Sequence, residues 1–187
     1  MRCERIARAS FCFAVSNVVS GMATMTIVYG LTMMMLTMLG SDQVAPDFSG
    51  IWQMNLGKST ILGSKPQWML VKIEHQGANL VQDMLVRHEN AAEERIVFTY
   101  DMAGKEAVNS LRGTPVRTRG HWEGSVLVIE SAMKVADREV RLRDHWSLSA
   151  DGQTLTMAHP DDDLAGQTSV LEKAGPEAAA KFDKTGK

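Results

Sequence analysis

Hydrophobic and polar residues alternate in short segments from residue 50 to residue 173. Alternation sends successive side chains to opposite faces of an extended chain, so each segment is typical of a half-buried β-strand. Residues 76–79 and 150–153 separate such segments and contain the glycines typical of hairpin turns. The pattern predicts about eight to ten antiparallel strands, over 51–56, 67–75, 80–88, 95–102, 108–112, 116–123, 126–135, 139–149, 154–158 and 167–173.

The predicted fold class is all-β, because no helical period of useful length interrupts these segments. An open meander of strands exposes two edges, and closure into a barrel removes edges most completely. We therefore expect residues 42–175 to form one β-barrel domain. For the tail, residues 176–187, the sequence predicts either a short helix with Pro176 near its first position or a disordered end.

The first 41 residues have a different pattern. No charged residue occurs from 11 to 40, and Arg2, Arg5 and Arg8 precede this run. This order is typical of a signal peptide or of an N-terminal hydrophobic helix that anchors the chain in a membrane, and residues 21–39 are long enough to span one. No clear cleavage site follows, so both alternatives remain open, and an uncleaved helix would leave the arginines on the cytoplasmic side. Either alternative predicts an extracytoplasmic domain, in the periplasm or cell envelope, that is membrane-anchored or secreted.

Charge and cysteine content exclude several classes of function. The formal net charge is −2, and three arginines against one glutamate give residues 1–41 a net of +2, which leaves −4 on the remainder. A mildly acidic domain without a basic run is unsuited to nucleic acid, because phosphate neutralisation needs clustered lysine and arginine. Cys3 and Cys12 both precede the domain, which therefore has no disulfide, thiol nucleophile or cysteine zinc site.

Motifs for cofactors and metal ions are also missing from the sequence. Residues 57–60 (Gly-Lys-Ser-Thr) match the end of a phosphate-binding loop, but Trp52 stands where that loop has its first glycine, and no helix is predicted to follow. The acidic run 161–163 lacks the spacing and glycine of a calcium loop, and we expect it to be a solvated turn. The sequence predicts no cofactor and no metal site.

Alternation also predicts which side chains point into the barrel. On 139–149, Leu142 and Trp146 share one face, and the arginines share the other. The strand 116–123 has the same arrangement, with Trp122 opposite its arginines. We interpret the arginine faces as solvated outer walls, because an anion-binding inner wall would require the tryptophans to face water.

Asp144 departs from this pattern, because it lies on the apolar face between Leu142 and Trp146. A buried carboxylate must be paired, hydrogen-bonded or neutralised. His75 and His159 fall on the predicted inward faces of their own segments. Asp144 with a histidine would form either an acid/base couple or a structural pair.

Two stretches of the sequence resemble a known group of proteins. Residues 50–52 (Gly-Ile-Trp) resemble the G-x-W opening of lipocalins and related calycin barrels, whose tryptophan closes one end of the barrel. Residues 47–52 with Lys58 and Ser59 after them, and later 146–156, resemble exported bacterial lipocalin-like proteins. Lys173 stands where lipocalins have an arginine packed on that tryptophan. The resemblance implies an exported lipocalin-like barrel with a cavity, and no known reaction.

Three functions are consistent with these features. The first is a binding module, because a barrel of about eight strands can enclose one small apolar ligand. The second is a structural or interaction protein of the cell envelope, with a filled barrel that acts through its surface, and the third is an enzyme that uses Asp144 with a histidine. An interaction protein would use the outer face that carries Arg117, Arg119, Arg141 and Arg143. The predicted ligand-binding residues, each of which can also be plain core, are Trp68 or its neighbour Met69, Phe98, Tyr100, Trp122, Leu127, Leu142, Asp144 and Trp146.

Overall fold

The computed structural model describes residues 45–185, so the predictions for 1–41, including its hydrophobic helix, lie outside the described residues. Within 45–185, no helix has the length and apolar character needed to cross a membrane. Residues 45–185 form ten β-strands and one helix, which confirms the all-β prediction for this part of the chain. The strands are β1 (Gly50–Met54), β2 (Trp68–Gln76), β3 (Asn79–Arg87), β4 (Glu94–Asp101), β5 (Ala107–Leu111), β6 (Thr114–Glu123), β7 (Val126–Val135), β8 (Arg138–Leu148), β9 (Thr154–Ala158) and β10 (Thr168–Lys173).

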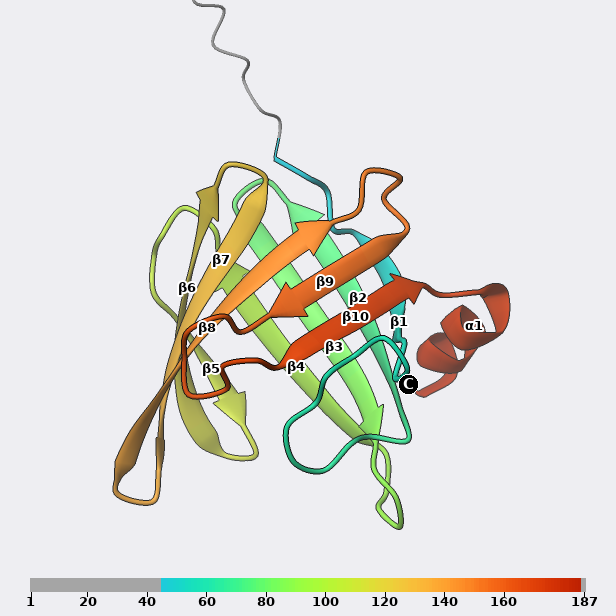
Figure 1. Cartoon of the computed structure of the whole chain (residues 1–187), viewed down its shortest axis with the longest axis horizontal. Helices are drawn as coiled ribbons and strands as arrows, with labels where there is room; N and C mark the ends of the chain where they lie inside the picture. Colours follow the sequence, from blue (N-terminus) through green and yellow to red (C-terminus); the bar gives the residue numbers. More distant parts are fainter. Residues whose placement is uncertain (1–44, 186–187) are drawn as a thin grey trace, which may run out of the picture. The chain divides into compact units, whose positions relative to one another are not determined.

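The strands form one antiparallel sheet that curls into a nearly closed barrel (Figure 1). The strand order is β4-β3-β2-β1-β10-β9-β8-β7-β6-β5. The first and last strands pair with each other, and the two edges of the sheet are the consecutive strands β4 and β5. The predicted antiparallel meander is therefore confirmed, and its seam lies in the middle of the chain.

An asparagine side chain bridges the seam between β4 and β5. The Oδ1 atom of Asn109 accepts a hydrogen bond from the Thr99 backbone N–H at 2.8 Å, and its Nδ2 donates to the Thr99 carbonyl at 2.9 Å. The amide therefore pairs with both backbone groups of Thr99, as a neighbouring strand would do. Arg112, in the turn after β5, also donates from Nε to Glu94 of β4 at 2.7 Å. Side chains thus hold together two edges that the backbone ladder leaves apart.

Trp52 anchors one end of the barrel. Its side chain is fully buried, and its Nε1 donates to the Phe48 carbonyl at 2.9 Å. Lys173 lies opposite Trp52 in the β1–β10 ladder and places Nζ 3.9 Å from the centroid of the indole ring, a cation–π contact. Gly50 makes room for this lysine, because a Cβ there would lie 2.5 Å from Nζ, and its φ of +135° favours glycine. The Gly-Ile-Trp stretch therefore has a packing explanation.

The helix α1 (Pro176–Thr185) lies against the outside of the barrel (Figure 1). Of the two states predicted for the tail, the structure shows the helix. Phe182 is buried against Leu70 and Leu85, which belong to the outer face of β2 and β3. Lys181 places Nζ 3.4 Å from the ring centroid of Trp68. Trp68 thus packs under the helix and not in the barrel interior, which is where alternation along the sequence predicts it.

Candidate functional site

The barrel interior is tightly filled at the Trp52 end. Phe48 stacks on Trp122 with a ring-centroid distance of 5.7 Å and meets Trp146 edge-on at 6.0 Å. Leu127 is fully buried in the same cluster. Trp122 and Leu127, both predicted to bind a ligand, therefore belong to this packed core and do not line the cavity described next.

The other end of the interior has a cavity of about 410 Å³ that is open to solvent. Inward positions of β1, β2, β3, β7 and β9 each contribute a methionine to its wall. The methionine side chain is flexible and polarizable, so a wall of this kind adapts to apolar molecules of different shape. The five methionines are Met54, Met69, Met84, Met133 and Met157.

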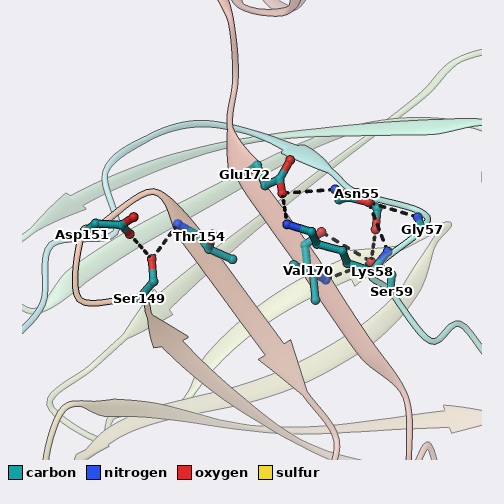
Figure 2. A network of polar contacts seen from close by, with 9 residues as sticks. All are labelled: Asn55, Gly57, Lys58, Ser59, Ser149, Asp151, Thr154, Val170 and Glu172. Carbon is teal, nitrogen blue, oxygen red and sulfur yellow. Dashed lines mark hydrogen bonds and ion pairs between the residues drawn. The ribbon is translucent and has the colours of Figure 1, made fainter.

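The loop between β1 and β2 borders this cavity with its second half, residues 61–66. Its first half is fixed to the barrel wall, as Figure 2 shows. The Oδ1 atom of Asn55 accepts hydrogen bonds from the backbone N–H groups of Gly57 and Lys58, and Lys58 pairs with Glu172 of β10 at 2.8 Å. Ser59 accepts a hydrogen bond from the Val170 backbone at 2.9 Å. Residues 57–60 therefore anchor the loop, which gives a structural reason for the stretch that matched a phosphate-binding loop.

A second polar network in Figure 2 fixes the turn between β8 and β9. The Ser149 hydroxyl donates to Asp151 at 2.6 Å and accepts a hydrogen bond from the Thr154 backbone at 2.9 Å. Ser149, Asp151 and Thr154 belong to the later of the two stretches that carried the sequence resemblance, and Lys58 and Ser59 of the β1–β2 loop belong to the earlier one. Both stretches have a role in holding loops in place.

Three aromatic residues line the inner part of the cavity. Phe98 and Tyr100 project inward from β4 and meet edge-on, with ring centroids 6.1 Å apart and an interplanar angle of 88°. Tyr100 and Trp146 meet at 5.9 Å and 78°. Since Trp146 also contacts Phe48, it forms the boundary between the filled end and the cavity.

Asp144 also lines the cavity, and it is part of a buried group of charges. The His159 ring lies between two carboxylates, with Nε2 3.0 Å from Asp144 and Nδ1 2.7 Å from Asp162. Burial alone would lower the pKa of His159, but the hydrogen bonds and charges of Asp144 and Asp162 outweigh it and raise the pKa to about 9. The His159 side chain therefore stays protonated at neutral pH, and the group as a whole carries a net negative charge.

This arrangement limits the chemistry available to the predicted Asp–His couple. A general base needs a ring nitrogen that is free to accept a proton. Both ring nitrogens of His159 are occupied by carboxylates, and the raised pKa disfavours the neutral form at pH 7. The geometry therefore supports a structural role for His159, which holds Asp144 in position at the cavity wall.

Tyr100 connects the carboxylate to a neutral part of the wall. Its hydroxyl donates to Gln82 Oε1 at 2.7 Å. Burial and the nearby charge of Asp144 raise the pKa of Tyr100, so the hydroxyl stays neutral. Among the atoms of residues 45–185, the buried indole Nε1 of Trp146 has no hydrogen-bond partner. The inner end of the cavity therefore combines a carboxylate, a neutral hydroxyl and an indole N–H that forms no hydrogen bond within the described residues.

The cavity gathers most of the residues predicted to bind a ligand, but not all of them. It is lined by Phe98, Tyr100, Leu142, Asp144, Trp146 and the alternative residue Met69. His159, which was one of two histidines considered for Asp144, is the partner, whereas His75 stacks with Phe48 at the filled end.

Two kinds of residue were not predicted. The first kind is the cavity methionines and Gln82. Alternation could have identified their inward positions, but neither a flexible methionine nor a single glutamine is a residue type that points to a binding site. Asp162 was expected in a solvated turn, and this expectation is wrong because its side chain is only 5% exposed. Its burial depends on contacts with His159 and with the backbone of Arg143, which no local pattern records.

The arginine faces of β6 and β8 form the outer wall, as expected, and they border a groove of about 750 Å³. Each of the four arginines already has an acidic partner. Arg117 and Arg141 pair with Glu139, Arg119 pairs with Glu106, and Arg143 pairs with Glu123 and Asp161. Exposed pairs of this kind contribute little stability. They also leave little uncompensated positive charge for an acidic partner.

The sequence matches no protein-family model and no curated protein. Among solved structures, the chain is similar to the crystal structure of secretory abundant heat soluble protein 4 from Ramazzottius varieornatus, with 12% sequence identity and a TM-score of 0.48. The match covers 71% of this chain and 99% of that chain. At this level the similarity carries no information about a ligand, so we base the function on the geometry of the cavity.

Proposed function

We propose that the protein is an extracytoplasmic β-barrel that binds one small, mainly apolar molecule in its methionine-lined cavity. The observation that supports this proposal most strongly is the cavity itself. Its volume of about 410 Å³ is within the range of small-molecule sites, which are concave, mostly apolar and furnished with a few polar groups. The location outside the cytoplasm is supported by the arginines and the long uncharged run of residues 1–40.

The two other functions have weaker support. An interaction protein with a filled barrel requires an interior without usable space, whereas this interior has a cavity of about 410 Å³. An enzyme built on Asp144 requires a proton acceptor, and His159 is held protonated between two carboxylates. Ligand binding needs an accessible apolar cavity with a few polar groups, and the methionine and aromatic lining with Asp144 provides one.

A fluorescence titration with N-phenyl-1-naphthylamine, an apolar dye that brightens on leaving water, tests the proposal. The full-length chain is compared with two variants of neighbouring residues on β7. Ser131→Leu adds bulk at a residue that lines the cavity, and Ala132→Leu adds similar bulk on the opposite face of the strand. Any dye bound by residues 1–44 contributes equally to all three proteins.

We expect the wild type and Ala132→Leu to bind the dye with similar affinity, and Ser131→Leu to bind it at least about tenfold more weakly, because the added side chain removes space from the site. A thermal unfolding curve for each protein verifies that the variants are folded. Equal dye binding by all three folded proteins would contradict the proposal.

A further inference from the structure

The inner end of the cavity combines aromatic faces with a single negative charge. Phe98 and Tyr100 meet at an interplanar angle of 88° and Tyr100 and Trp146 at 78°, and all three rings line the cavity. Asp144 is the one carboxylate among the described residues that line the cavity. Aromatic faces attract cations through the ring quadrupole, and this attraction is strongest where water is excluded.

The carboxylate of Asp144 has an oxygen available for a ligand. His159 takes Oδ1, and no residue of the described range 45–185 forms a hydrogen bond or ion pair with Oδ2. The side chain is 23% exposed, which shows that it is not sealed into the wall. Asp162 on the far side of His159 is almost fully buried and does not line the cavity. The negative charge that a ligand can reach is therefore that of Asp144.

From this arrangement we infer that the preferred ligand is an apolar molecule with an organic ammonium group, which lies among Phe98, Tyr100 and Trp146 and pairs with Asp144. This inference rests on the proposed function, because it assigns the head group of a ligand in the same cavity. The methionines accommodate the apolar part of the molecule.

Three basic side chains lie at or beside the cavity. His88 follows β3 and lies near Glu94, and the other two are Arg112 and His159. Arg112 lines the cavity, but its guanidinium donates to Glu94 across the seam. His159 is positively charged and is compensated by two carboxylates. An anionic head group would have to approach Asp144 without a free cation beside it, and a neutral head group would gain no charge attraction. Both are therefore weaker ligands than an ammonium group of the same chain length.

Displacement of the bound naphthylamine dye by octylamine, n-octanol and octanoate near neutral pH tests the inference. The three probes share one alkyl chain and differ in head-group charge. All three can form a hydrogen bond at the inner end, but only the ammonium group brings a full positive charge to the Asp144 carboxylate, and hydrogen bonds between two charged groups are the stronger kind. We therefore expect wild-type full-length protein to bind octylammonium about tenfold or more tightly than octanol, and octanoate most weakly.

Two aspartates on either side of His159 supply a matched pair of variants. Asp144→Asn removes the charge at the cavity wall, so the ratio of the octanol Kd to the octylammonium Kd should fall to about one. Asp162→Asn removes one charge and one contact of the same histidine outside the cavity, and the preference should persist. Phe98→Leu provides a second test if Asp144→Asn fails to fold, with a severalfold smaller preference expected from the lost ring.

The outcomes separate the inference from the proposed function. Binding of the dye with no preference for octylammonium would overturn the inference and leave the proposed function intact. An equal loss of preference in both aspartate variants would also overturn it, because the effect would then come from the state of His159. If neither the dye nor any octyl probe binds, as followed directly by tryptophan fluorescence, both the inference and the proposed function fail.

Discussion

The two ends of the barrel interior are built from the same strands and differ in how completely side chains fill them. At the Trp52 end, large rings and leucines pack closely, and Phe48, Trp52 and Leu127 are fully buried. At the other end, methionines and Phe98 are partly exposed to a cavity. On β8 the change occurs within a few residues, because Trp146 is 2% exposed whereas Leu142 is only half-buried.

This difference separates the sources of stability and of function. Close packing of large apolar side chains supplies most of the favourable free energy of folding. A cavity forgoes part of that gain, because atoms that border empty space lose their contacts. The barrel therefore has one end that stabilises the fold and one end where the loss of packing is compatible with binding a ligand.

The largest expected effect is a difference in stability between two variants, Trp52→Ala at the filled end and Phe98→Ala at the hollow end. Trp52→Ala creates a new cavity in the filled end and removes a buried hydrogen bond, so it should lower the free energy of unfolding by about 3–5 kcal/mol. Phe98→Ala enlarges a space that already exists, and we expect a loss of about 2 kcal/mol or less. Urea unfolding followed by circular dichroism measures both. Equal losses would show that the two ends are packed alike.

A smaller effect should depend on pH through His159, which holds Asp144 at the hollow end. Its pKa is raised from 6.5 to about 9 in the folded protein, so the stabilisation is fully present below about pH 6.5 and is lost as pH rises through about 9. The difference in unfolding free energy between the wild type and His159→Gln should therefore shrink by about 1–3 kcal/mol across that interval. Denaturant unfolding at several pH values provides the measurement. A difference that is constant with pH would contradict the charge pairing.

The smallest effect concerns the seam beside the cavity, where Thr99 lies between the lining residues Phe98 and Tyr100. Asn109→Ala removes both hydrogen bonds to the Thr99 backbone, and we expect a loss of about 1 kcal/mol because these groups are partly solvated. Amide hydrogen exchange at Thr99 should accelerate as well. Ser110→Ala, the next residue on the same strand, is the control and should leave the exchange rate unchanged. An unchanged rate in Asn109→Ala would mean that the side chain does not close the seam.

Local alternation was sufficient to predict the strands and the inward face of β4, because large apolar residues recur there at every second position, at 96, 98, 100 and 102. It was ambiguous on β2, where both faces are apolar. Met69 points into the barrel, and Trp68 is covered by Lys181 of α1. The strand itself carries no information about a helix that begins about 100 residues later along the chain, so the outward face looked equally suited to the core.

The cavity itself was beyond prediction from the sequence for a different reason. Whether inward side chains fill a barrel depends on the sum of their volumes across all the strands and on their rotamers. The resemblance at residues 50–52 implied that a cavity was present, but the sequence could not place it at the end opposite Trp52. The pairing of His159 with Asp162 as well as Asp144 likewise requires the loop after β9 to fold back, which no periodic pattern describes.

Crystallography of the protein under xenon pressure tests the division of the interior most directly. Xenon occupies apolar cavities and cannot enter close-packed core. We predict xenon density among Met84, Phe98 and Met133 in the hollow end and none between Phe48 and Trp52. Density at both ends, or a hollow end that side chains have filled, would contradict the account.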